Sequence, residues 1–125
     1  MVKTAIDLRK LVGRFVELLS RDIVVDRVIL SGDYAQGSET DDSDIWLLVI
    51  SPSFEGMQWG QRSDLLALAG MKVDFLIQSG GFTPDELART YKSEGGNIFL
   101  GMMLNQSREI YTNPAVSQTQ EDRDD

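Results

Sequence analysis

The most informative pattern in this chain is GDYAQGSETDDSDIWLLVI, residues 32–50. One apolar run ends just before it, and a second apolar run follows its three aspartates, Asp41, Asp42 and Asp44. Two glycines, Gly32 and Gly37, bracket a short polar segment between the runs. This order predicts a strand, a glycine turn with a short helix, and then a strand with carboxylates at its start. α/β proteins use such an arrangement to place a phosphate near a metal ion.

Hydrophobic periodicity and turn residues predict the other elements. A capping hydroxyl and a proline predict that one late helix begins at Pro84, and residues 92–96 interrupt it. The expected helices cover residues 4–20, 33–37, 59–68 (closed by Gly70), 84–91 and 97–104. The expected strands cover residues 24–31, 44–50, 71–78 and 108–111, with a break at Gly80-Gly81. In the last helix, the expected core residues are Phe99, Met102 and Met103.

The residues of the 32–50 pattern resemble the signature of the minimal nucleotidyltransferases, small members of the DNA polymerase β-like superfamily. That signature is Gly-Ser, an Ala-Arg-Gly helix, and Ser-Asp-Ile-Asp-Leu entering a strand. The matching positions, with no gap, are Gly32, Ala35, Gly37, Ser43, Asp44, Ile45 and Leu47. Further matches lie at residues 54–57, Val73-Asp74 and 108–111, so the resemblance covers residues 10–113. It implies an α/β (α+β) nucleotidyltransferase fold, a small mixed sheet of about four strands flanked by helices.

Three positions depart from that signature. The serine after Gly32 is Asp33, the arginine before Gly37 is Gln36, and the second aspartate of the Asp-x-Asp pair is Trp46. Each of these positions belongs to the site at which the resemblance implies that the reaction takes place. We therefore expect an active site that is impaired or that serves another purpose.

The resemblance implies that Asp44 and Asp74 are the catalytic residues and the ligands of Mg²⁺. Residues two apart on a strand share a face, so the family pair aims two carboxylates at one site, and a third aspartate on the neighbouring strand completes it. Trp46 is no ligand for a hard cation, so we expect at most one weakly held ion. Asp42 and Asp44 are also two apart, and a shifted pair stays an alternative, although the start of the apolar run favours Asp44.

The resemblance also implies a nucleotide site, with ATP as the candidate substrate, at Gly32, Asp33, Gly37 and Ser43. A carboxylate at Asp33 would repel an incoming triphosphate. We interpret Asp33 as a built-in anion in the place of the phosphate. The simpler alternative is that Asp33 only caps the short helix.

The composition excludes several kinds of chemistry. The chain has no cysteine and no histidine, which excludes a thiolate zinc site and a serine–histidine triad. Twenty acidic residues and twelve basic ones give a net charge of −8. This charge disfavours binding to nucleic acid and favours binding to a basic protein. No apolar run is long enough to span a membrane, and we expect a cytoplasmic protein. One domain is expected over residues 1–113, followed by an acidic, disordered tail over residues 114–125.

Two functions of different classes follow from the resemblance. In the first, transferase activity is weak or lost, and the chain is the antitoxin-like binding partner of an all-helical HEPN ribonuclease toxin. The alternative is an active Mg²⁺-dependent nucleotidyltransferase that moves AMP from ATP to a protein or small-molecule hydroxyl. A nucleotide sensor without turnover is a third reading. The sequence leaves homo-oligomerisation open.

Overall fold

The computed structural model of the chain describes residues 1–116, and the predicted tail lies outside these residues from position 117 onward. The helices are α1 (Ala5–Leu19), α2 (Asp33–Gln36), α3 (Trp59–Val73), α4 (Pro84–Lys92) and α5 (Ile98–Leu104), with a 3₁₀ turn, η1, at Pro52–Phe54. The strands are β1 (Arg27–Ser31), β2 (Ile45–Ile50), β3 (Ile77–Phe82) and β4 (Arg108–Thr112).

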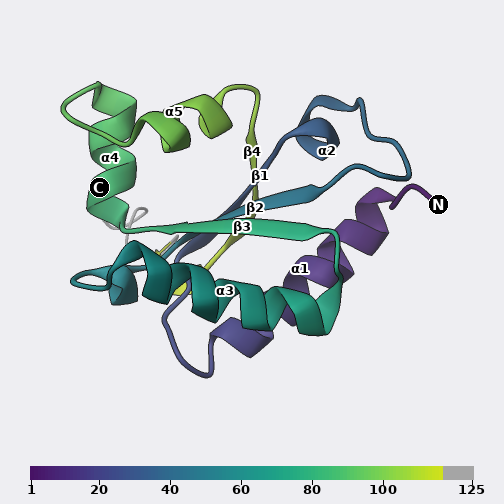
Figure 1. Cartoon of the computed structure of the whole chain (residues 1–125), viewed down its shortest axis with the longest axis horizontal. Helices are drawn as coiled ribbons and strands as arrows, with labels where there is room; N and C mark the ends of the chain where they lie inside the picture. The colour runs from purple at the N-terminus through teal and green to yellow at the C-terminus, as the bar shows by residue number, and fades with distance from the viewer. Residues whose placement is uncertain (117–125) are drawn as a thin grey trace.

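The four strands form one mixed sheet in the order β3-β2-β1-β4. β1 runs antiparallel to both β2 and β4, whereas β2 and β3 are parallel and are joined by α3. Helices α1 and α3 cover one face of the sheet, and α4 and α5 lie on the other (Figure 1). The predicted small mixed sheet flanked by helices is confirmed.

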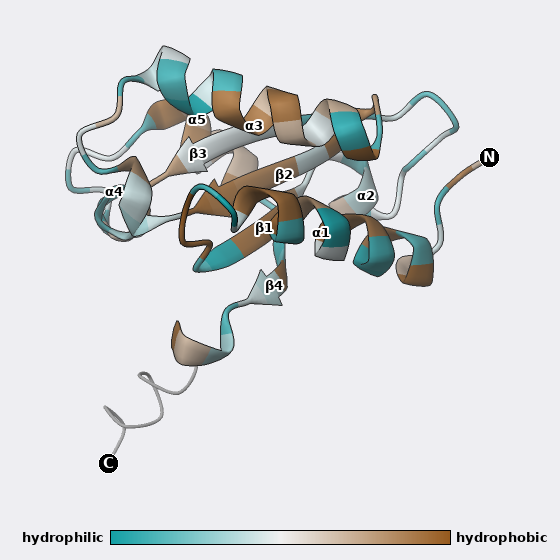
Figure 2. Cartoon of the chain, turned by 90° about the horizontal axis from the view of Figure 1, so that it is seen from below, coloured by the Kyte–Doolittle hydropathy of each residue, from teal (hydrophilic) through white to brown (hydrophobic). Residues whose placement is uncertain are grey.

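The central strand β2 supplies side chains to both layers of the core. Ile45, Leu47 and Val49 pack with α1 and α3, while Leu48 and Ile50 pack with α4 and α5. Apolar residues dominate β1 and β2 in Figure 2. This two-sided burial explains why residues 45–50 are uniformly apolar rather than alternating.

Local capping signals set the helix ends. Thr4 caps α1 and Thr83 caps α4, and each forms a reciprocal capping box with the acid three residues later. Pro84 occupies the first turn of α4, as expected. No helix among residues 1–116 combines the length and the apolar character that crossing a membrane requires.

The prediction for the third strand is wrong. Helix α3 continues through Gly70 to Val73, and β3 begins only at Ile77. The expected break at Gly80-Gly81 lies inside β3. A Cβ at Gly81 would approach the Phe54 ring to 2.7 Å, so this glycine makes room for a core aromatic side chain and does not turn the chain. The first strand is also shorter than expected and starts at Arg27.

Arg62 is a buried cation that ties α3 to β3 and α4. Its side chain is 7% exposed. Its Nη1 donates to the Gly81 carbonyl at 3.2 Å and to Glu86 Oε1 at 2.8 Å, and its guanidinium lies 4.2 Å from the ring centroid of Trp59. A buried charge is tolerated only when it is paired and hydrogen-bonded in this way.

Candidate functional site

The glycine turn between β1 and α2 has a backbone that requires glycine. Gly32 is the N-cap of α2 with φ of 74°, and Gly37 ends the helix in the left-handed region. A Cβ on Gly32 would lie 3.1 Å from Trp46 Cδ1. The indole of Trp46 therefore lies directly against the turn.

Asp33 and Ser43 together fix the loop between α2 and β2. Asp33 is the first residue of α2, and the capping position belongs to Gly32. Asp33 Oδ2 accepts a hydrogen bond from Ser43 Oγ at 2.8 Å, and Ser43 Oγ in turn accepts one from the Thr40 amide at 2.9 Å. The reading of Asp33 as the cap is thus wrong, and its role as a stand-in for a phosphate stays a prediction.

The face of the sheet beside the turn carries one carboxylate, one indole and one amide. Asp44 directly precedes β2 and is exposed. Trp46 lies on β2, and its register partner on the parallel strand β3 is Gln78. The residue of the neighbouring strand beside Trp46 is therefore an amide, whereas the carboxylate expected on that strand, Asp74, lies before it. The sequence prediction placed Gln78 at the end of the third strand, whereas it lies near the start of β3, and for that reason its position beside Trp46 was missed.

Asp74 does not lie on a strand. It is the C-cap of α3. Its carboxylate forms an ion pair with Lys3 Nζ at 3.0 Å and accepts a hydrogen bond from the Leu76 amide at 2.9 Å. Burial tends to raise the pKa of Asp74, but the Leu76 amide and Lys3 outweigh it and hold this pKa below the usual value. The hydrogen bond with Asp74 also raises the pKa of Lys3. Asp74 is therefore already bound to a cation of its own chain.

The donor set does not fit a magnesium cluster of the family type. Within residues 1–116, no three acidic side chains are grouped so that they could hold a metal ion. The role of Asp44 and Asp74 as metal ligands stays a prediction.

Comparisons with known proteins identify the family and support the fold. Residues 8–94 match the family model described as "Nucleotidyltransferase domain". The chain belongs to this nucleotidyltransferase family, within the polymerase β-like superfamily. It is also similar in fold to a crystal structure described as a "putative nucleotidyltransferase" from Sulfolobus solfataricus, with a TM-score of 0.55 and 21% identity over 71% of this chain and 82% of that one. A search of curated proteins finds no match.

In this nucleotidyltransferase domain, α5 covers the strand end at the glycine turn. The Ser31 hydroxyl donates to the Met103 carbonyl, and the Phe99 ring lies 6.0 Å from that of Trp46, between centroids. The expectation that Phe99 and Met102 are core residues is wrong, because 45% and 72% of their surfaces are exposed. Composition alone could not show which side of α5 faces the sheet.

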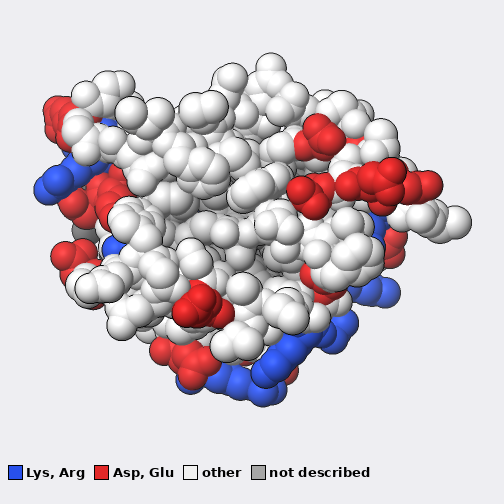
Figure 3. All heavy atoms as spheres, viewed as in Figure 1, with Lys and Arg blue, Asp and Glu red and all other residues white. Residues whose placement is uncertain are grey.

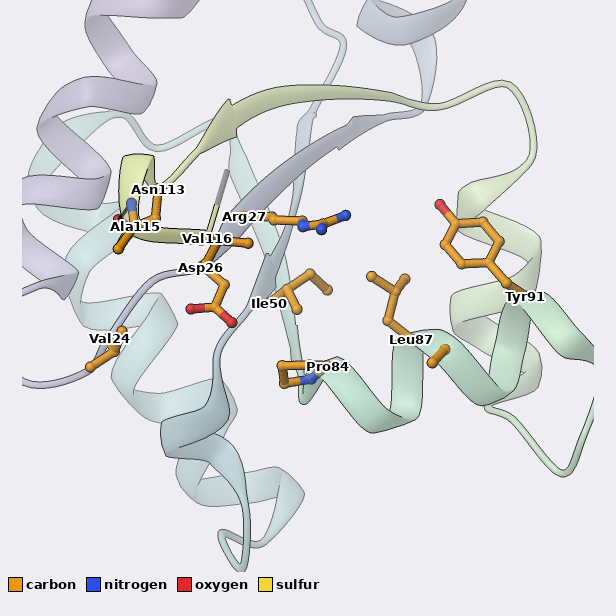
Figure 4. Close-up of a pocket in the computed structure, with 11 residues that line it drawn as sticks. Val24, Asp26, Arg27, Ile50, Pro84, Leu87, Tyr91, Asn113, Ala115 and Val116 are labelled. Carbon is orange, nitrogen blue, oxygen red and sulfur yellow. Dashed lines mark hydrogen bonds between the residues drawn. The ribbon is translucent and has the colours of Figure 1, made fainter. Parts of the chain in front are cut away.

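A separate cavity of about 600 Å³ lies at the opposite end of β2 from the turn. Figure 4 shows Ile50, Leu87 and Asp26 among the residues that line it, together with the Asn113–Val116 segment. Burial raises the pKa of Asp26. None of the residues of the 32–46 motif lines this cavity.

Replacing Asp74 by asparagine should lower the free energy of unfolding by about 1 kcal/mol at pH 7, because the ion pair with Lys3 is lost. The pKa of Asp74 is lowered in the folded state, so its contribution is present at neutral pH and disappears as the pH falls through that lowered value. Urea unfolding at pH 7 and at pH 3 should therefore show a smaller difference from the wild type in acid. The exposed Asp64→Asn is the control, with an effect within about 0.5 kcal/mol. An equal loss at both pH values would contradict this role of Asp74.

Proposed function

We propose that this nucleotidyltransferase domain is of the minimal type, that its transferase activity is weak or lost, and that it acts by binding a protein. The observation that carries the proposal is the pairing of Trp46 with Gln78, two positions after Asp44. Nucleotidyl transfer needs divalent cations to neutralise the triphosphate. Mg²⁺ is held by carboxylate oxygens with water and substrate phosphates, and an indole supplies none of these ligands.

The proposed partner is an all-helical HEPN ribonuclease toxin, with this chain as its antitoxin. The resemblance to minimal nucleotidyltransferases is the source of this assignment, and the net charge of −8 supports it. A ribonuclease needs a basic surface to hold its RNA, and an acidic protein can cover such a surface. This arrangement would place the chain in the cytoplasm.

The first test is a calorimetric titration of ATP into the protein with and without Mg²⁺. We expect no binding in either condition. Binding that appears only with Mg²⁺, followed by transfer of AMP to a protein, would instead establish the alternative of an active enzyme. The exposed carboxylate of Asp44 is the observation that favours this alternative. Binding without transfer would indicate a nucleotide sensor.

The second test addresses the antitoxin role directly. The protein encoded beside this chain would be purified, and its cleavage of RNA measured with increasing amounts of the domain. We expect cleavage to fall to background at a fixed stoichiometric ratio without any ATP present. RNA cleavage that persists, or inhibition that requires ATP, would contradict neutralisation by binding.

A further inference from the structure

Helix α5 is apolar on its outer side as well as on its inner side. Leu100 is fully buried, and Met103 and Leu104 pack against the core. On the outer side, Ile98 is 83% exposed and Met102 is 72% exposed. A surface helix normally carries polar residues on its outer face, and one that is apolar all round is normally covered.

The exposed apolar side chains of α5 continue onto the sheet. Phe99 contacts Trp46, and residues 95–107 contain no charged side chain. We call Trp46, Ile98, Phe99 and Met102 the α5 patch. Contiguous exposed apolar surface of this kind marks sites where proteins interact.

An acidic loop borders the α5 patch. It connects β1 to β2, and residues 32–46 include no lysine or arginine. Trp46 links the two surfaces, because it touches Gly32 and lies two residues after Asp44. Figure 3 shows a group of acidic side chains at the upper right of a broad uncharged surface, and further acidic side chains at its left and lower edges. The acidic residues of the loop are Asp33, Glu39, Asp41, Asp42 and Asp44.

The carboxylates of this loop are largely without cations of their own chain. Among residues 1–116, the one ion pair of the loop joins Asp41 to the terminal amino group of Met1. Glu39 Oε2 is buried and, within the same residues, has no hydrogen-bond partner. A buried acceptor without a donor is costly, whereas the carboxylates of Asp41, Asp42 and Asp44 are exposed and can be reached by lysine or arginine of a partner.

We propose that the α5 patch and the acidic loop form one docking surface for a basic protein, which inserts apolar side chains against α5 and places lysine or arginine against the loop. This inference rests on the proposed function and names the surface that performs it. An apolar centre with a charged rim is the usual anatomy of a protein interface. A second copy of this chain would bring its own acidic loop toward the first, and like charges oppose that contact.

The test uses a defined probe, a synthetic amphipathic helical peptide of leucine and lysine, with calorimetry as the readout. One control peptide replaces leucine by serine, and another replaces lysine by glutamate. We expect the leucine–lysine peptide alone to bind, and the double variant Ile98→Ser, Met102→Ser to weaken binding about tenfold or more. Asp41→Asn with Asp42→Asn should weaken it and reduce its dependence on salt.

The matched control is Leu68→Ser with Met71→Ser, which removes two apolar side chains of similar exposure, 63% and 76%, from α3. This variant should keep the wild-type affinity. Absence of peptide binding, binding of the glutamate peptide, or equal losses in the two serine variants would overturn the inference. Sedimentation that reveals a dimer broken by the α5 substitutions would assign the surface to a second copy and overturn it too.

The same variants separate this inference from the proposed function. If the wild type inhibits the toxin and Ile98→Ser with Met102→Ser inhibits it equally well, the docking surface is wrong and the antitoxin role stands. If the peptide binds at α5 and no toxin is inhibited, the surface stands and the antitoxin role is wrong.

Discussion

Replacing Arg62 by alanine is expected to lower the free energy of unfolding by about 3–5 kcal/mol. The substitution leaves Glu86 without its partner at 2.8 Å and the Gly81 carbonyl without its donor. It also removes the cation that lies over Trp59. Urea unfolding followed by circular dichroism measures the loss.

Two further variants show whether burial causes the effect. Arg89 pairs with Asp85 at 3.0 Å, but both side chains are more than half exposed. Arg89→Ala should therefore cost about 0.5 kcal/mol or less. Arg62→Lys keeps the positive charge but lacks the planar guanidinium group with its several donors. We expect this variant to retain only part of the stability that Arg62→Ala loses. Equal losses for Arg62→Ala and Arg89→Ala would contradict the structural role of Arg62.

The paired substitutions Trp46→Asp and Gln78→Asp are expected to create Mg²⁺ binding that the wild type has only weakly or not at all. They place carboxylates on register partners of adjacent strands, close to Asp44. Three carboxylates in one place match the oxygen ligands that Mg²⁺ prefers. We expect an increase in affinity of about tenfold or more, measured by calorimetry with Mg²⁺ alone.

The control for this experiment is Trp46→Asn with Gln78→Asn, which has the same size without the charge. It should not gain affinity for Mg²⁺. Both pairs lose the contact of Trp46 with Phe99, so circular dichroism should confirm that each variant is folded. A wild type that already binds Mg²⁺ tightly, or a folded aspartate variant that gains nothing, would contradict our reading of this sheet face.

The chain's own residues predicted those features that depend on near neighbours. The start of α4 depends on the Thr83 cap, on Pro84 and on the acid three residues after Thr83. The strand over residues 45–50 depends on a continuous apolar run. The residues that carry the resemblance, and the differences predicted at Asp33 and Trp46, could be read in the same way, because all of them lie within one short segment.

The features that the sequence did not predict depend on contacts between segments that are far apart in the chain. Gly81 looks like a break until Phe54, 27 positions earlier in the numbering, is seen to fill the space where a Cβ would lie. Gln78 belongs to the site because the register of β3 on β2 places it beside Trp46.

The sequence by itself determined the family, the central strand and the helix starts, and it placed a tryptophan where the resemblance predicts a second aspartate. Only the tertiary structure decided where β3 begins, which residue faces Trp46 and which side of α5 remains exposed. The physical reason is that caps and apolar runs act over a few residues, whereas strand register and burial depend on segments that meet only after folding.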